Sequence, residues 1–286
     1  SLLALILLRK YLIKHFYISI PVFLLAFAAL FIFNKSNNYL SIQLNKLLNI
    51  NKTQSKLTDI QTMDDEIRVT YNGNILRTKF FLDDMGNCFF DVTDDTDNVI
   101  PVTYDEINGP LTVQDERFPG FIITPVLYDN IYSFTIKIDG HDWYFTNQTE
   151  DGTYYFINNY GKLDKIKTAP SALFTDYEHY GSGRGYLWSR TIPLLKKHLF
   201  LGSGADTFVF EFPQQDYVNL YNYGYETQLV TKPHSLYLQI GVQTGVLSLL
   251  AFVAFYLMYF ISSFKLYIKG QFKSYYSKVG LSIFIG

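Results

Sequence analysis

Two long uncharged segments dominate the pattern of hydrophobic and polar residues along the chain. Residues 16–33 and residues 235–264 contain no Asp, Glu, Lys or Arg, and both are rich in large apolar side chains. In a helix, which rises about 1.5 Å per residue, the shorter segment would reach about 27 Å, close to the roughly 30 Å apolar thickness of a bilayer. The pattern therefore predicts two membrane-spanning helices, and two buried core helices are the alternative.

The charged residues give these spans a direction. Seven Lys and Arg flank the spans on the sides away from the connecting loop: Arg9, Lys10, Lys14, Lys265, Lys269, Lys273 and Lys278. All 26 Asp and Glu lie in that loop together with 17 Lys and Arg, which leaves it with a formal charge of −9. Because short basic flanks stay in the cytoplasm, we expect the loop to lie on the outer face of the membrane.

The predicted fold class is a membrane α-helical protein, a fragment of a polytopic bundle, with a large extracytoplasmic, mainly β, loop domain. The apolar ends of the chain are interpreted as parts of further spans, so a multi-pass protein of the cell membrane is expected. The expected segments are the end of a truncated span with a basic cytoplasmic turn (1–15), a transmembrane helix (16–34), the extracytoplasmic loop (35–232), a second transmembrane helix (233–264), a basic cytoplasmic loop (265–280) and the start of another span (281–286).

Composition excludes several classes of function. The acidic loop and the net charge of −2 give no basis for nucleic-acid binding. The single cysteine, Cys88, cannot form an internal disulfide or a Cys-based zinc site, and no His and carboxylate pairing at helical ligand spacing supports a zinc site. We therefore expect no cofactor, no metal and no nucleic-acid partner, whereas membrane lipid is an expected partner.

Within the loop, a β-rich insert is expected at about residues 66–165. Apolar and polar residues alternate there, and Tyr, Phe, Ile, Val and Thr are frequent, as in strands. The Asn-Gly pair at 72–73 and the Asp-Gly pair at 139–140 are typical of hairpin turns, so the insert is predicted to be a meander of about eight short strands. The polar residues 34–58 are expected to form a short amphipathic helix near the membrane surface.

Aromatic residues of this insert allow two interpretations. They either stack on sugar rings as a glycan-binding platform or form the core and faces of an ordinary sheet. The residues in question are Tyr144, Phe145, Tyr154 and Tyr155. Aromatic side chains at strand spacing are core residues more often than ligand surface, which favours the second interpretation.

A membrane-proximal helical part is expected at about residues 180–232. Residues 184–198 predict a helix in which Pro193 produces a kink or starts the second half. Further on, Pro233 suits the first turn of the second span, which would place His234 at the outer end of that span.

Small residues follow His234 at helical spacing. Gly241 and Gly245 lie seven and eleven residues after it, so a continuous helix would place all three on one face. The two glycines also form a Gly-x-x-x-Gly pair, which lets another helix approach closely. We therefore expect this face to pack against protein.

The same region resembles the signature of the O-antigen ligase and polymerase family of membrane glycan transferases. That signature has a His, then Asn, Ser or Gln, nine residues and a Gly at the start of a span after a large outer loop; His234, Ser235 and Gly245 have this spacing. Ser248 stands where the family often has Gly, Thr or Tyr. The resemblance covers roughly residues 180–260. Its upstream part is matched in order by Ser182, Gly183, Arg184, Trp188, Gly202, Gly204, Asp206 and Phe208.

The resemblance implies a reaction and roles for three residues. Family members transfer a glycan from an isoprenoid diphosphate carrier to an acceptor hydroxyl outside the membrane, in surface polysaccharide biosynthesis. This chemistry needs a base for the hydroxyl and positive charge for the departing diphosphate. His234 is the expected catalytic base or substrate-orienting residue, and Arg184 and Arg190 are expected to bind the diphosphate. The isoprenoid diphosphate-linked glycan and other membrane proteins of polysaccharide assembly are the expected partners.

Three nearby features are open to interpretation. If Arg184 begins a helix, the backbone amides there would add to the anion site. The turn at 202–204 either exposes amides to phosphate or is a plain tight turn, which is favoured. His179 and His198 flank the region and do not match the family motif.

Two other classes of function are alternatives to the transferase. One is a binding or sensor protein whose outer β domain is framed by two spans, and the signature from His234 to Gly245 favours the transferase over it. The other is a flippase or transporter subunit. Few polar residues lie within the two spans, which argues against a transport path through them.

Overall fold

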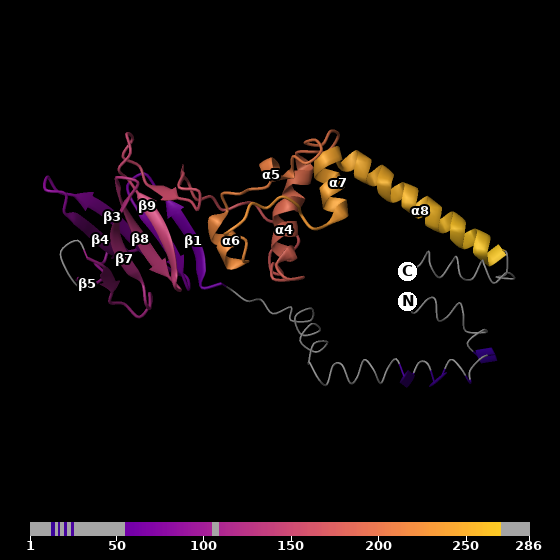
Figure 1. Ribbon diagram of the computed structural model, residues 1–286, viewed down its shortest axis with the longest axis horizontal. Coiled ribbons are helices and arrows are strands. Elements are labelled where there is room, and N and C mark those ends of the chain that lie inside the picture. The colour runs from indigo at the N-terminus through magenta and orange to yellow at the C-terminus, as the bar shows by residue number, and fades with distance from the viewer. Residues whose placement is uncertain are drawn as a thin grey trace.

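The computed structural model describes residues 55–104 and 109–269, together with isolated positions at 13, 14, 17, 20, 21, 24 and 25. This part of the chain has a β part and a helical part, and the long helix α8 (Val246–Lys269) extends on the side away from the β part (Figure 1). The first predicted span apart from those isolated positions, the predicted amphipathic helix at 34–58 up to residue 54, the polytopic bundle and the segments after residue 269 lie outside the described residues. Residues 57 and 58, at the end of that predicted helix, belong to a strand instead.

A four-stranded antiparallel sheet opens the β part. The hairpin expected at 72–73 is confirmed, since Asn72 and Gly73 have φ values of 48° and 79°, the left-handed conformations that this turn requires. The strands, each paired with the next, are β1 (Leu57–Thr62), β2 (Ile67–Tyr71), β3 (Asn74–Leu82) and β4 (Cys88–Asp94).

Strand β1 lies before the start of the expected insert. Its buried apolar residues, Leu57 and Ile60, are three positions apart because the pairing register shifts between Leu57 and Asp59. A bulge of this kind breaks the alternation with period two that identifies a strand in a sequence. The insert therefore begins at residue 57 rather than at about 66.

A seven-stranded antiparallel sheet completes the β part, again with strands paired in chain order. The hairpin at 139–140 is confirmed, with φ of 49° at Asp139 and 85° at Gly140. The meander is thus divided between two sheets and has more strands than the expected eight or so. The strands are β5 (Val102–Tyr104), β6 (Leu111–Val113), β7 (Ile122–Tyr128), β8 (Ile131–Ile138), β9 (His141–Thr146), β10 (Tyr155–Ile157) and β11 (Leu163–Asp164).

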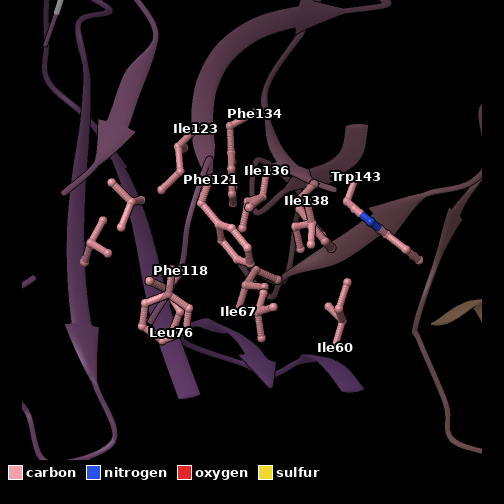
Figure 2. Packing of buried hydrophobic residues seen from close by; sticks show 14 of the residues in the cluster. Ile60, Ile67, Leu76, Phe118, Phe121, Ile123, Phe134, Ile136, Ile138 and Trp143 are labelled. Atoms are coloured by element: carbon pink, nitrogen blue, oxygen red, sulfur yellow. The ribbon is translucent and has the colours of Figure 1, made fainter. Parts of the chain in front are cut away.

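The apolar core lies between the two sheets (Figure 2). Phe80 of β3 contacts Phe134 of β8 with ring centroids 5.2 Å apart, and Phe90 of β4 contacts both rings. Full burial of one such side chain stabilises the fold by about 2 kcal/mol. Because both sheets contribute to one core, they form a single folded unit.

The helical part follows the second sheet. The helix expected at 184–198 is confirmed together with its interruption: α4 ends at Thr191, and Pro193, which has no amide hydrogen to donate, lies in the first turn of η1. The elements before α8 are α4 (Arg184–Thr191), the 3-10 helix η1 (Ile192–Lys196), α5 (Phe208–Glu211), α6 (Tyr217–Asn222) and α7 (Leu236–Thr244).

Helix α6 joins the helical part to the sheets. Its Val218 is buried in the core between the sheets, whereas Leu220, two residues later, is buried in the helical part. The Tyr217 hydroxyl donates to Oδ2 of Asp164 at 2.7 Å, and the Asn222 side chain donates to the carbonyl oxygen of Leu57 at 2.8 Å. These contacts hold the β part in a defined position against the helices that carry the candidate site.

The second apolar segment is not one helix, which corrects the expected continuous span. Helix α7 ends at Thr244, Gly245 has φ 98° and ψ 154°, and α8 begins at Val246. His234 precedes α7 and Gly245 ends it, so the prediction that they share a helix face is wrong. One helix within the described residues is long and apolar enough to cross a membrane, at Val246–Lys265.

Candidate functional site

Arg184 is the first residue of α4, and its side chain is exposed. The chain turns sharply around it: Gly183 has a φ of 85°, and a Cβ on Gly185 would lie 2.1 Å from the carbonyl oxygen of Tyr177. Across residues 55–104 and 109–269, the Arg184 guanidinium has no ion-pair partner. Its charge is therefore accessible to an anionic ligand.

The backbone amides beside Arg184 are already engaged. The amide of Gly185 donates to the carbonyl oxygen of Tyr180 at 2.9 Å, and the amide of Tyr186 donates to that of Glu178, also at 2.9 Å. For these two amides, the expectation that they add to an anion site is wrong, because the preceding turn satisfies them. Positive charge at this place comes from the guanidinium.

His234 lies in an exposed position just before α7. Its φ of 50° is left-handed, a conformation that is uncommon for residues other than glycine. Pro233 before it is buried, and the side chain of Ser235 after it accepts a hydrogen bond from the amide of Leu238 at 3.5 Å at the start of α7. Both neighbours therefore hold the backbone of His234 while its imidazole faces solvent.

A hydrogen bond connects α4 to the residue before His234. The indole Nε1 of Trp188 donates to the carbonyl oxygen of Pro233 at 3.0 Å. Trp188 lies four residues after Arg184, about one helical turn and 6 Å along the axis, so both side chains project from the same face of α4. The structure thus links the segments that carry Arg184 and His234.

Arg190, the third candidate, lies in the interior of the helical part. Its Nε donates to Oδ2 of Asp216 at 2.8 Å, and its Nη1 contacts Glu178 and the Ser189 hydroxyl. All four of these side chains are buried. Unlike the exposed Arg184, Arg190 uses its guanidinium to neutralise two carboxylates of the protein.

Two tyrosines complete this buried network. The Tyr186 hydroxyl donates to Asp216 at 3.2 Å, and the Tyr223 hydroxyl donates to Glu178 at 2.5 Å. Burial raises the pKa of Asp216, and Arg190 opposes that effect only in part. Burial also raises the pKa of both tyrosines, so they stay neutral donors. The sequence gives no local signal for these partners, since Glu178 and Asp216 are 12 and 26 residues from Arg190.

The Gly-Ser-Gly turn is a structural turn, as the favoured interpretation expected. The amides of Ser203 and Gly204 donate to the carbonyl oxygens of Val242 and Gln243 at 2.9 and 3.0 Å. A Cβ on Gly202 would lie 2.1 Å from the backbone of Gln243. The Gly-Ser-Gly segment therefore caps carbonyl groups in the last turn of α7, and its amides at these two positions are not free to bind phosphate.

The other two histidines of the region have protein partners. The ring of His179 contacts that of Tyr223 at 4.7 Å, and Nε2 of the buried His198 lies 3.0 Å from Oε2 of Glu211. Among the residues that the structure describes, no group of three or more His, Cys, Asp or Glu side chains could hold a metal ion.

The proposed aromatic platform is largely interior. Phe145 and Tyr154 are buried in the core between the sheets, while Tyr144 and Tyr155 are half-buried. The ammonium group of Lys165 lies 4.3 Å from the centre of the Tyr155 ring and covers one of its faces. The core interpretation is confirmed for the two buried residues.

Comparison with known families gives a match for part of the chain. Residues 126–253 match the family described as O-Antigen ligase, which confirms the resemblance seen in the sequence. The match begins in β7 and ends in α8, so it includes part of the β-rich insert that the sequence pattern left out. Families of this kind are membrane-embedded ligases or polymerases of polysaccharide biosynthesis. No curated protein and no solved structure matches the chain.

Proposed function

We propose that the protein is a membrane glycan polymerase or ligase that transfers a glycan from an isoprenoid diphosphate carrier to an acceptor hydroxyl on the outer face of the membrane. The hydrogen bond from Trp188 to Pro233 carries this proposal, because it holds the residue before His234 against the helix that begins at Arg184. The family match includes all four residues and favours a transferase over a sensor or binding protein.

The reaction assigns a separate task to each exposed group. The acceptor oxygen attacks the anomeric carbon, the bond from that carbon to the diphosphate oxygen breaks, and the hydroxyl proton must leave. His234 accepts or directs this proton, since imidazole is the side chain best suited to do so near neutral pH. Arg184 neutralises the diphosphate with its planar, permanently charged guanidinium.

Arg190 has a supporting task in this proposal. Its guanidinium already neutralises Glu178 and Asp216, so a diphosphate would compete with two buried carboxylates for the same donors. Removing the cation would leave both acids unpaired in the interior, which is strongly unfavourable. We therefore place diphosphate binding at Arg184 and interior support of α4 at Arg190.

Replacing His234 by Ala in the full-length membrane protein tests the proposal directly. Transfer from an isoprenoid diphosphate-linked glycan should fall at least a hundredfold, the usual contribution of a general base, while the protein remains in the membrane. The matched control is His179→Ala, which removes another exposed histidine from the same region and should leave transfer intact. Normal transfer by the His234 variant would refute the proposed role.

A further inference from the structure

A short loop beside α8 exposes three consecutive large apolar side chains. Leu199, Phe200 and Leu201 are 51%, 76% and 83% exposed. They follow η1 and precede the turn that closes α7, so they lie at the junction of three elements of the helical part. Contiguous exposed apolar side chains of this kind mark a surface that contacts a membrane, another protein or a ligand.

Hydrogen bonds fix this loop at the first turn of α8. The amides of Val246 and Leu247, the first two residues of α8, donate to the carbonyl oxygens of His198 and Leu199 at 2.9 and 3.1 Å. These are amides that no residue within α8 can satisfy, since the first turn of a helix lacks internal partners. The loop consequently lies at the depth at which the candidate span Val246–Lys265 begins.

Neighbouring side chains extend the apolar surface. Leu247 and Leu250 of α8 are both exposed, and the apolar window of this helix is 0% buried. Phe210 of α5 is 85% exposed, and the adjacent Glu211 pairs with His198 at the base of the loop. The apolar loop is therefore continuous with the surface of the candidate span.

The polar groups around the loop are arranged as a membrane boundary requires. Lys196 and Lys197 precede the loop and are exposed, and the ammonium of Lys197 pairs with Glu211 at 2.8 Å. The carbonyls of His198 and Leu199 are satisfied by the amides of α8. Backbone groups that enter an apolar phase need such partners, while cations are favoured at the level of lipid headgroups.

We propose that the loop at residues 199–201, together with Phe210, inserts into the outer leaflet of the bilayer and contacts lipid acyl chains. It would act as an additional membrane anchor beside α8 and hold the helical part, with its exposed Arg184 and His234, close to the membrane surface. The proposal depends on the orientation of α8 in the bilayer and not on the transfer reaction.

Single-cysteine spin labelling of the full-length protein in lipid nanodiscs tests this insertion. In a cysteine-free background, which includes Cys88→Ala, Phe200→Cys and, separately, Leu201→Cys receive the label. Met85→Cys is the matched control, because Met85 is 86% exposed on the turn between β3 and β4. Collision with oxygen, which concentrates in lipid, is compared with collision with a water-soluble nickel chelate.

Labels at 200 and 201 should collide several times more with oxygen than with the nickel chelate, and the label at 85 should show the reverse. Equal nickel accessibility at 200, 201 and 85 would place the loop in water and overturn the proposal. Protection of both loop labels from both reagents would show that another protein segment covers the loop, which would also overturn it. The accessibilities of the labels should be the same in a His234→Ala background. Failure of the insertion proposal can therefore be distinguished from failure of the proposed function.

Discussion

The indole nitrogen of Trp188 donates a hydrogen bond of 3.0 Å to the carbonyl oxygen of Pro233. The Trp188 ring also contacts those of Phe174 and Tyr180, with centroids 5.2 and 6.0 Å apart. A tryptophan held by these contacts can position the backbone that precedes His234. This geometry leads to the first prediction.

Trp188→Phe should lower transfer about tenfold, because a small displacement of a catalytic group is costly even when its chemistry is intact. Loss of the hydrogen bond should lower the free energy of unfolding by only about 1 kcal/mol. Initial transfer rates and melting temperatures of the purified membrane protein measure the two effects. Tyr180→Phe is the control, since it alters the same aromatic cluster and keeps the indole donor. Full activity of the Trp188 variant would show that this hydrogen bond does not position His234 for transfer.

Arg184→Met should impair transfer without changing stability. The side chain is exposed and has no ion-pair partner in the described parts of the chain, so the free energy of unfolding should change by no more than about 0.5 kcal/mol. Arg184→Lys keeps the charge and loses the fork of donors, so it should raise KM for the carrier while it retains more activity than the Met variant. If both variants turn over carrier as the unmodified protein does, Arg184 does not bind the diphosphate.

Arg190→Met should have the opposite profile. It leaves Glu178 and Asp216 buried without their cation, which should cost about 3–5 kcal/mol of stability. Thermal unfolding of the same preparation used for Arg184→Met provides the matched comparison, since the substitution is identical and only the environment differs. A stable Arg190 variant that fails to transfer glycan would instead indicate that Arg190 binds the substrate.

How much of this arrangement the sequence predicts depends on the range of each interaction. The hairpins at 72–73 and 139–140 are local, because two adjacent residues determine the turn, and both were correctly predicted. The end of α4 just before Pro193 is local as well, because a proline within the chain segment is enough to interrupt the helix. Strand β1 escapes the pattern because a bulge alters its spacing. The break at Gly245 escapes it because an uncharged apolar run has the same composition whether it forms one helix or two.

Interactions between residues far apart in the sequence limit how much of the candidate site can be predicted from the sequence alone. His234 and Arg184 were identified from a motif, and their exposure is consistent with that assignment. The motif contains Arg184 and not Arg190, but it does not show that Arg190 is engaged inside the protein, because its partners Glu178 and Asp216 approach only after the chain has folded. Trp188 belongs to the motif, yet its bond to Pro233 spans 45 residues and has no counterpart in any sequence pattern.

Gly245→Ala should disrupt the junction of α7 and α8. A Cβ there would lie 2.7 Å from the carbonyl oxygen of Phe200, in a backbone conformation that side chains rarely adopt, so we expect a cost of about 3 kcal/mol. Gly224→Ala is the control, because Gly224 also has a positive φ, 76°, but no atom within 4 Å of a built Cβ, and it should cost about 1 kcal/mol. Equal melting temperatures of the two variants would show that the close contact with Phe200 is unimportant.

The β part should lose stability in acid through Glu66, which is buried beside Arg77 with 2.9 Å between its Oε2 and the guanidinium. Burial alone would raise the pKa of Glu66, but hydrogen bonds from Arg77 and Arg68 outweigh it and hold the pKa below its ordinary value of 4.5. A carboxyl group with a lowered pKa in the folded state contributes stability above its ordinary pKa, and this contribution is lost as the pH falls through the folded value.

Glu66→Gln should therefore melt at a lower temperature than the unmodified protein at pH 7, and the difference between the two melting temperatures should narrow toward pH 3. Asp91→Asn, which changes an exposed carboxylate on β4, should keep the pH dependence of the unmodified protein. A constant difference between the Glu66 variant and the unmodified protein from pH 7 to pH 3 would contradict this origin of the acid sensitivity.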